Sequence, residues 1–268
     1  MCATDDNMTG EGQSHTAADC KLSVQKLSVF YGAVQAIKSL DLGVYPNEIL
    51  GITGPSGSGK TSLLQTINRL NDRIPTYRHE GTVLLDGDDV YGPDMDVNQL
   101  RRRIGIVFDL PTPLPKSIFE NVVFGLRVSG VRDRKILQER AEQALRDAIL
   151  WDEVKDRLNH PALRLSGGQQ QRLSIARALA AQPEIVMLDE PCSGLDPIST
   201  LKIEQALWDL KQRYTIVLVS HNVQQASRAT DRTAFVLMGE LIECRPTAAM
   251  FTNPRDQRTA DFLEGRFG

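Results

Sequence analysis

A glycine-rich loop that ends in lysine and threonine is the first feature of the sequence with a defined chemistry. Residues 54–61 read Gly-Pro-Ser-Gly-Ser-Gly-Lys-Thr and fit the pattern G-x-x-x-x-G-K-[ST] in full. Its glycines let consecutive backbone N–H groups point into one anion-sized hollow, at the positive end of the helix that follows. We expect Lys60 to reach the β- and γ-phosphates of a nucleotide and the Thr61 hydroxyl to ligate Mg²⁺.

The alternative for this segment is a flexible Gly/Ser turn, but such a turn requires neither lysine nor threonine at its last two positions. The apolar strand before the loop and the helical pattern after it supply the context that nucleotide binding needs. The predicted nucleotide-binding residues are Gly54, Pro55, Ser56, Gly57, Ser58, Gly59, Lys60, Thr61 and Ser62. The loop predicts binding and does not by itself specify a reaction.

Two adjacent acids, Asp189 and Glu190, follow a short apolar run at residues 185–188. Ligand sites in doubly wound sheets lie at the carboxyl ends of strands, so both acids are placed for chemistry. Asp189 is suited to hold Mg²⁺ through water, and Glu190 to orient and polarise an attacking water. The sequence Asp-Glu-Pro could instead simply end a strand. Together with the loop at residues 54–61, the two acids favour a nucleotidase in which Lys60 and Glu190 are catalytic.

Short strands and helices alternate around these residues. Alternating or continuous apolar residues predict strands, and apolar residues three or four apart predict helices. The predicted strands cover residues 22–31, 40–45, 48–53, 82–85, 104–108, 185–188, 215–219 and 233–238, and the predicted helices cover 63–70, 134–151, 166–180 and 201–210. The pattern predicts an α/β fold whose parallel-sheet core is interrupted by a mostly helical insertion at about residues 100–180.

The composition limits the classes of protein to which the chain can belong. Its 31 basic and 34 acidic residues give a net charge of −3, which argues against binding nucleic acid through bulk positive charge. Four cysteines without a Cys-x-x-Cys pair indicate a reducing cytoplasm. Apolar runs have strand length, far short of the ~20 residues of a membrane-spanning helix. Residues 1–20 are polar and predict a disordered arm, which leaves one domain over residues 21–268.

A second small-residue motif narrows this interpretation. Residues 165–172, Leu-Ser-Gly-Gly-Gln-Gln-Gln-Arg, resemble the signature sequence of the ATP-binding cassette (ABC) ATPases. Physically, the serine is a helix N-cap that opens a second anion-binding nest. The resemblance implies that two subunits pack head to tail and enclose ATP between one subunit's loop and the partner's signature residues Ser166, Gly167, Gly168 and Gln169. It also implies a P-loop NTPase core with a parallel sheet, an antiparallel β subdomain and a helical insertion.

Further positions resemble landmarks of the same family in the expected order. Asp196, at the end of Ser-Gly-Leu-Asp, resembles the D-loop residue that communicates between the two sites. His221 resembles the switch histidine, which implies a catalytic contact with the γ-phosphate. Tyr31 resembles the aromatic residue that stacks on adenine, although a core role stays open; Phe30 faces the opposite way and is a candidate core residue. The other histidines lack such a context and are expected to be surface or structural residues: His15, His79 and His160.

One landmark departs from the family pattern. The family has glutamine after the strand at residues 104–108, whereas this chain has Asp109. Aspartate still ligates a hard cation, but it cannot donate a hydrogen bond and it adds negative charge near ATP. We expect Asp109 to join Thr61 and Asp189 as a metal ligand, and to alter metal dependence or slow turnover without abolishing it.

Several strings outside these motifs resemble the ATP-binding subunits of bacterial phosphate importers. They lie at residues 67–75, 191–200, 220–226 and 251–268, and Gly194 joins Asp109 in departing from that pattern. The resemblance implies an ATPase that drives phosphate uptake from the cytoplasmic face of the inner membrane, as a peripheral protein. Its implied partners are a second copy of itself, two integral membrane permease subunits and, indirectly, a phosphate-binding protein.

Other functions stay open at this point. One alternative is an importer ATPase for another solute, and a second is a slow-hydrolysing nucleotide switch in phosphate signalling, suggested by Asp109. A non-transport ABC ATPase that acts on nucleic acid or the ribosome commonly has tandem cassettes or long coiled-coil insertions. The sequence shows neither feature, so we expect no nucleic-acid partner.

Overall fold

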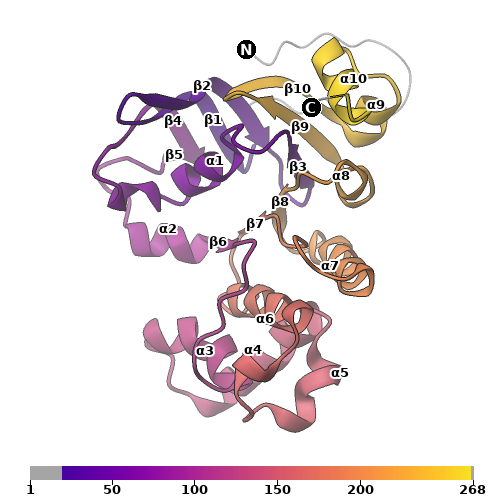
Figure 1. The fold of residues 1–268 in the computed structure, drawn as a ribbon. Helices are drawn as coiled ribbons and strands as arrows, with labels where there is room; N and C mark the ends of the chain where they lie inside the picture. The colour runs from indigo at the N-terminus through magenta and orange to yellow at the C-terminus, as the bar shows by residue number, and fades with distance from the viewer. Residues whose placement is uncertain (1–19, 267–268) are drawn as a thin grey trace.

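The computed structural model describes residues 20–266, so the arm predicted at residues 1–20 and His15 lie almost wholly outside the described part of the chain. The first of two β-sheets is antiparallel and has the strand order β2-β1-β4-β5 (Figure 1). Its strands are β1 (Leu22–Tyr31), β2 (Val34–Val44), β4 (Tyr77–Leu85) and β5 (Asp88–Asp89). This sheet is the antiparallel subdomain that the family resemblance implied.

Several strands of a second, six-stranded sheet end at the predicted nucleotide-binding and catalytic residues. Its order is β10-β9-β3-β8-β7-β6, and all neighbours pair in parallel except β9 and β10. Its strands are β3 (Ile49–Thr53), β6 (Ile104–Val107), β7 (Ile185–Asp189), β8 (Thr215–Val219), β9 (Arg232–Leu237) and β10 (Glu240–Pro246). Every residue of β3, β7 and β8 is buried, which explains why these strands appear in the sequence as continuous apolar runs.

Ten α-helices within residues 20–266 surround the two sheets. They are α1 (Lys60–Ile67), α2 (Val97–Arg103), α3 (Ile118–Val128), α4 (Arg134–Asp147), α5 (Trp151–Val154), α6 (Gly167–Leu179), α7 (Pro197–Leu210), α8 (Val223–Ala229), α9 (Thr247–Thr252) and α10 (Gln257–Leu263). No helix in this part of the chain is both long and apolar enough to cross a bilayer.

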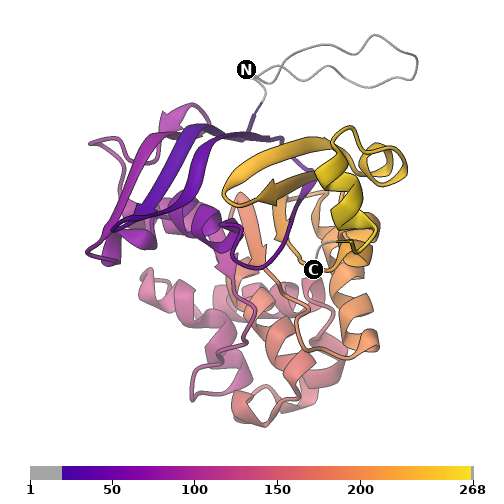
Figure 2. The same cartoon turned by 45° about the horizontal axis from the view of Figure 1, so that its top comes forward.

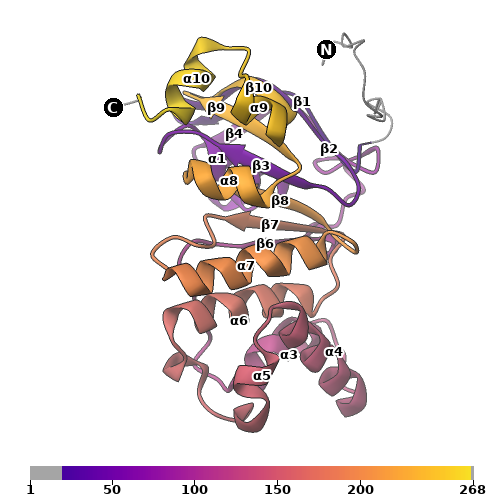
Figure 3. The same cartoon turned by 90° about the vertical axis from the view of Figure 1, so that its right-hand side faces the viewer.

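The two faces of the six-stranded sheet are covered by different elements. Side chains alternate along β7, so that Val186 and Leu188 join one hydrophobic cluster while Ile185 and Met187 join the other. The first cluster includes α3, α4, α6 and α7, and the second includes α1 and the antiparallel sheet. Helices α1 and α6 therefore lie on opposite faces of one sheet. Figure 3 shows this arrangement, with α6 and α7 below β6 and β7 and with α1 above them.

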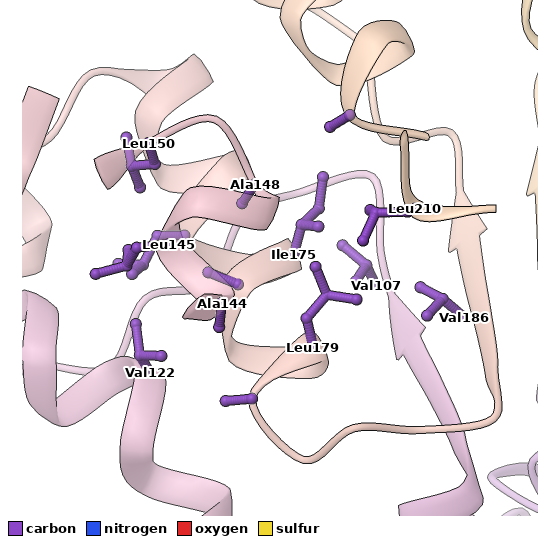
Figure 4. Close-up of a cluster of buried hydrophobic side chains, with 14 of the residues drawn as sticks. Val107, Val122, Ala144, Leu145, Ala148, Leu150, Ile175, Leu179, Val186 and Leu210 are labelled. Atoms are coloured by element: carbon purple, nitrogen blue, oxygen red, sulfur yellow. The ribbon is translucent and has the colours of Figure 1, made fainter. Parts of the chain in front are cut away.

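The helical layer packs against the sheet through small and branched side chains. Figure 4 shows Ala144 and Leu145 of α4 close to Ile175 and Leu179 of α6, which continue toward Val186 of the sheet. The predicted insertion at residues 100–180 is too long at its start, because residues 104–107 form β6 and pair with β7. The helices of the insertion cover residues 118–179.

Several element boundaries differ from the sequence prediction for local reasons. The helix predicted at 134–151 ends at Asp147, because Ile149 has a φ of 49°, in the left-handed region that a helix cannot continue through. Helix α7 starts four residues earlier than predicted, since Asp196 caps it and Pro197 occupies its first turn. The elements that were not predicted are the strands β5 and β10 and the helices α2, α3, α5, α8, α9 and α10.

The two sheets join beside the glycine-rich loop. Lys38 of β2 donates its backbone N–H to the carbonyl of Gly239, in the turn between β9 and β10, at 2.8 Å. Figure 2 shows the antiparallel sheet next to this C-terminal hairpin, with the helical layer beneath both. The loop after β3 is thereby held between the two sheets.

Candidate functional site

The loop at residues 54–61 folds as a tight backbone cradle. Gly54 and Gly59 have φ values of 148° and 92°, and Gly59 is the N-cap of α1. A Cβ on Gly54 would lie 2.0 Å from the carbonyl oxygen of Val236, and one on Gly59 would lie 2.4 Å from that of Ala36. Both positions therefore require glycine, for conformation and for close approach to neighbouring strands.

Lys60 is buried at the base of this cradle. Its Nζ donates to the carbonyl oxygens of Gly54 and Pro55, both at 2.8 Å. Burial lowers the pKa of Lys60, while the negative charges of Glu190 and Asp189 act in the opposite direction. Among residues 20–266, the hydrogen-bond partners of the ammonium are neutral carbonyl oxygens, so its charge is available to an anion that enters the loop.

Asp189 ends β7 and is 5% exposed. Its Oδ1 has no hydrogen-bond partner among the residues that the structure describes. Burial raises the pKa of Asp189, the Thr61 hydroxyl lowers it by hydrogen bonding, and the charges of Glu190 and Asp109 raise it further. A buried, unpartnered carboxylate oxygen beside a hydroxyl is the donor set that fits a divalent cation.

Glu190 adopts a strained backbone conformation at the end of the same strand. Its φ is 50°, and its backbone N–H donates to the carbonyl of Val219 on β8 at 3.0 Å. Its Oε2 lies 2.7 Å from Nδ1 of His221, which follows β8. Because β7 and β8 are neighbours, the sharp turn brings the acid and the imidazole together. Such strain commonly marks a functional position.

The segment at residues 165–172 begins α6 as the capping-box spacing predicted. The Ser166 hydroxyl accepts from the backbone N–H of Gln169 at 3.4 Å, and the Gln169 side chain accepts from the N–H of Ser166 at 3.1 Å. A Cβ on Gly168 would lie 2.2 Å from Oγ of Ser199 in α7, whereas Gly167 has open space. Asp196 caps α7, accepting from the Ser199 backbone at 2.9 Å and from its hydroxyl at 2.6 Å. The starts of α6 and α7 therefore touch.

Tyr31 ends β1 at the edge of the antiparallel sheet. Its ring lies 6.0 Å from that of Tyr77 and packs against the second hydrophobic cluster. Phe30 does not join that cluster and instead lies 3.6 Å beneath the guanidinium of Arg78. The prediction that Phe30, and not Tyr31, is the core residue is therefore wrong. His79 stacks between Tyr77 and Tyr91, a structural role as expected.

Comparisons with known proteins place this geometry in a family. The family described as "ABC transporter" matches residues 37–193. The chain is 52% identical over 252 residues to the "Phosphate import ATP-binding protein PstB" of Idiomarina loihiensis, covering 94% of this chain and 93% of that protein. This chain belongs to the ABC transporter ATP-binding family.

Solved ABC structures agree with the fold. The cbiO1 protein from Clostridium perfringens, part of the transporter complex cbiONQ, has a TM-score of 0.77 and 26% identity, covering 92% of this chain and 97% of that one. A post-hydrolysis dimer of the ATP-binding cassette MJ0796, bound to ADP and Pi, has a TM-score of 0.70 and 31% identity over 84% and 98% of the two chains. The predictions of an ABC ATPase and of its fold are confirmed.

Asp109, the residue that departs from the family pattern, is exposed on the loop after β6. Its charge reaches Asp189, whose pKa it raises. The preceding residue, Phe108, accepts a hydrogen bond through its carbonyl from Nε2 of Gln171 in α6, at 2.8 Å. The loop that carries Asp109 is thus tied to the start of the helix that the signature sequence opens.

Sequence reasoning missed residues that position this ABC ATPase site without belonging to a motif. Glu153 of α5 bonds Gln169, Arg172 and Lys202. The only signal in the sequence is an acid in a charged run, which most often is a solvated surface. The contact between Gly168 and α7 was equally hidden, because it joins segments thirty residues apart.

Proposed function

We propose that this chain is the ATP-hydrolysing subunit of an importer for inorganic phosphate. Hydrolysis rests on one observation above all: Glu190 and His221 are paired at 2.7 Å beside buried Asp189, at the ends of adjacent strands. The neighbouring strand β3 leads into the P-loop at residues 54–61. The cargo is inferred from the 52% identity to PstB.

The residues have distinct parts in the reaction. Backbone N–H groups of the P-loop and Lys60 bind the β- and γ-phosphates of ATP. His221 Nδ1 holds Oε2 of Glu190, which leaves Oε1 to accept a hydrogen bond from the attacking water. Catalysis of phosphoryl transfer is mainly positioning and charge stabilisation, and this arrangement supplies both.

The site also suits Mg²⁺, which neutralises charge on the transferred phosphoryl group when it is bound. The Thr61 hydroxyl and the unpartnered Oδ1 of Asp189 would hold it, with Asp109 as a further acid in range. The charges of Asp189 and Glu190 act on Lys60, and those of Glu190 and Asp109 act on Asp189.

A second copy of the chain completes each site. The P-loop opens α1 on one face of the six-stranded sheet, and the signature sequence opens α6 on the other face. One chain therefore cannot bring both nests to the same phosphate. Tyr31 stacks on adenine beside the P-loop, and Ser166 to Gln169 of the partner copy contact the γ-phosphate. The dimeric, nucleotide-bound MJ0796 structure supports this arrangement.

Membrane permease subunits dock near the loop that follows β6. Phe108 is 38% exposed and Leu110 72% exposed, and both line a shallow hollow of about 110 Å³ between this loop and α6. An apolar side chain on a short permease helix fits such a hollow. Closure and reopening of the dimer would then move the docked helix, because ATP makes different contacts in the open and closed states. The chain acts as a peripheral subunit on the cytoplasmic face of the inner membrane.

The decisive experiment uses Glu190→Gln in the full chain. We expect it to retain ATP binding, to lose orthophosphate release and to form a stable dimer in MgATP, measured by size exclusion with light scattering. Glu142→Gln makes the same chemical change at an exposed α4 ion pair and should behave as the unaltered chain. A monomer in MgATP would refute the shared-site mechanism. Purification from membranes without accompanying integral subunits, or growth on limiting phosphate unaffected by Glu190→Gln, would refute phosphate import.

A further inference from the structure

One carboxylate lies at the junction of three helices near the signature sequence. Glu153 Oε1 accepts from Nη1 of Arg172 at 2.8 Å and from Nζ of Lys202 at 2.6 Å. Its Oε2 accepts from Nη2 of Arg172 at 3.1 Å and from Nε2 of Gln169 at 2.8 Å. A single side chain of α5 thus contacts both the first turns of α6 and the first turns of α7.

The partners of Glu153 are themselves fixed. Arg172 is 3% exposed, and besides Glu153 it donates to the carbonyls of Ile149 at 2.5 Å and Gly168 at 3.3 Å. Burial opposes ionisation of Glu153, but hydrogen bonds from Arg172, Lys202 and Gln169 hold the pKa of Glu153 at about 2. Its carboxylate is therefore charged at neutral pH, and all its acceptor directions are used within the chain.

Gln169 links this cluster to the nucleotide-facing surface. The same side chain that donates to Glu153 accepts from the backbone N–H of Ser166, completing the capping box. The orientation of the nest at residues 166–169 thus depends on Glu153 through one intervening amide. Lys202 extends the connection to α7, whose N-cap is Asp196 of the D-loop.

We propose that Glu153 is a positioning residue that fixes the signature nest against α7, so that Ser166 and Asp196 meet the partner copy's nucleotide as one rigid surface. The proposal rests on the proposed function in one respect, the nucleotide shared between two copies. Glu153 itself touches no nucleotide. Its effect is therefore on completion of the partner's site, and the chain's own P-loop lies on the opposite face of the sheet.

The test is Glu153→Gln, which preserves size and removes the charge. Hydrogen bonds to a charged group are worth about one to two factors of ten in an equilibrium, so kcat for MgATP should fall by about tenfold or more. Affinity for ADP, which lacks the γ-phosphate that the signature contacts, should stay within about twofold in calorimetry, since distant sites are nearly independent. In a Glu190→Gln background, Glu153→Gln should abolish or strongly weaken the MgATP-dependent dimer.

A second substitution keeps the proposal testable if Glu153→Gln fails to fold. Lys202→Met leaves the Arg172–Glu153 pair intact and breaks only the link to α7, so we expect a smaller loss of kcat and of dimer with unchanged ADP affinity. Lys155→Met, which removes an exposed partner of Asp152, is the matched control and should change none of these.

The outcomes separate this proposal from the proposed function. If Glu190→Gln alone forms no dimer in MgATP, the shared-site mechanism fails. If it dimerises and both Glu153→Gln and Lys202→Met dimerise equally well, the positioning role of Glu153 is wrong. Equal losses of ADP affinity and kcat would also overturn it, because they would indicate a general loss of structure.

Discussion

The two phosphate-binding regions of this chain are built in different ways. The P-loop lies between two sheets, and its functional partners Lys60 and Asp189 are each only 5% exposed. The signature nest lies at an exposed helix start, where Ser166 and Gly167 face outward and the Gln169 side chain hydrogen-bonds to Ser166 and to Glu153. One region is enclosed by its own chain, and the other is an exposed surface, which the proposed function assigns to contact with the partner copy.

The supports of the two regions differ as well. Backbone contacts with β2 and β9 fix the P-loop, where a single Cβ would clash. At the signature nest, hydrogen bonds of Glu153 to Gln169 and Lys202 link α5 with α6 and α7, in addition to the close approach of Gly168 to Ser199. A backbone-defined site tolerates no change of shape, whereas one set by ion pairs can be adjusted by a few side chains. The orientation of the signature nest therefore depends on a few polar side chains, which the P-loop does not need.

The largest predicted effect distinguishes the P-loop, which binds nucleotide within one chain, from the signature nest, which completes the nucleotide site of the partner copy. Lys60→Ala should lower orthophosphate release by about 10²–10³-fold, as for loss of one preorganised electrostatic group, and should weaken ADP binding by the isolated chain. Ser166→Ala should lower turnover while ADP affinity, measured by calorimetry, stays unchanged. If Ser166→Ala weakens ADP binding as much as Lys60→Ala does, the two regions do not act on different copies.

The next largest predicted effect is a loss of stability when the packing at the signature nest is disturbed. Gly168→Ala would place a Cβ 2.2 Å from Ser199 Oγ and 2.7 Å from its Cβ, so it should cost about 1–3 kcal/mol through overpacking. Thermal unfolding should show a lower Tm by several degrees. Gly167→Ala, whose Cβ would meet only Leu195 at 4.0 Å, is the matched control and should leave Tm unchanged or slightly raised by better helix propensity. A lower Tm for Gly167→Ala alone would contradict this packing.

The residues around the P-loop could largely be predicted from the sequence, because they belong to contiguous motifs. Residues 54–61, the acids at 189–190 and strand β8 rest on contiguous patterns, and the structure places β1 and β8 at the predicted bounds. The capping box at Ser166 was predictable for the same reason. Glu190 and His221 come together because the ends of the adjacent parallel strands β7 and β8 meet at one edge of the sheet.

Contacts between segments far apart in the chain could not be predicted from the sequence. Glu153 looks like any surface acid until α5, α6 and α7 are packed together. Ile149 ends a helix whose apolar spacing continues past it, because the break depends on backbone conformation and not on hydrophobicity. The short strand β6 sits inside a mostly helical stretch, and only its pairing with β7 assigns it to the core.

Replacing Asp109, the acid that departs from the family pattern, should have a moderate effect on the dependence of turnover on Mg²⁺. Asp109→Gln removes a negative charge that acts on Asp189, so a divalent cation should bind several-fold more weakly, as expected for about 1 kcal/mol at an exposed position. The Mg²⁺ concentration for half-maximal phosphate release should rise, and Mn²⁺ bound with ADP, followed by electron paramagnetic resonance, should show the same shift. An unchanged Mg²⁺ requirement and an unchanged rate would remove Asp109 from the metal site.

The smallest predicted effect concerns the junction between the antiparallel sheet and the core. Glu184, just before β7, accepts hydrogen bonds from Arg103 and from Lys21, which hold the pKa of Glu184 at about 2 against its ordinary 4.5. Because the folded-state pKa is depressed, this interaction stabilises the chain above about pH 4.5 and is lost as the pH falls toward 2. The Glu184 side chain is 38% exposed, so solvent screening limits the gain to less than about 1 kcal/mol.

Glu184→Gln should therefore lower Tm at pH 7 by no more than a few degrees and narrow the difference in Tm between pH 7 and pH 3. Glu153, whose pKa is also about 2, should contribute in the same direction, so a Glu153→Gln chain should also show a smaller difference in Tm between pH 7 and pH 3. Glu142→Gln, at an exposed pair within one helix, should leave the difference unchanged. If all three variants reduce the difference in Tm between pH 7 and pH 3 equally, surface charge in general sets the stability in acid, and the ion pairs of Glu184 and Glu153 have no special part in it. The ion pairs of Glu184 and Glu153 would then add little to the stability that apolar packing between the layers supplies.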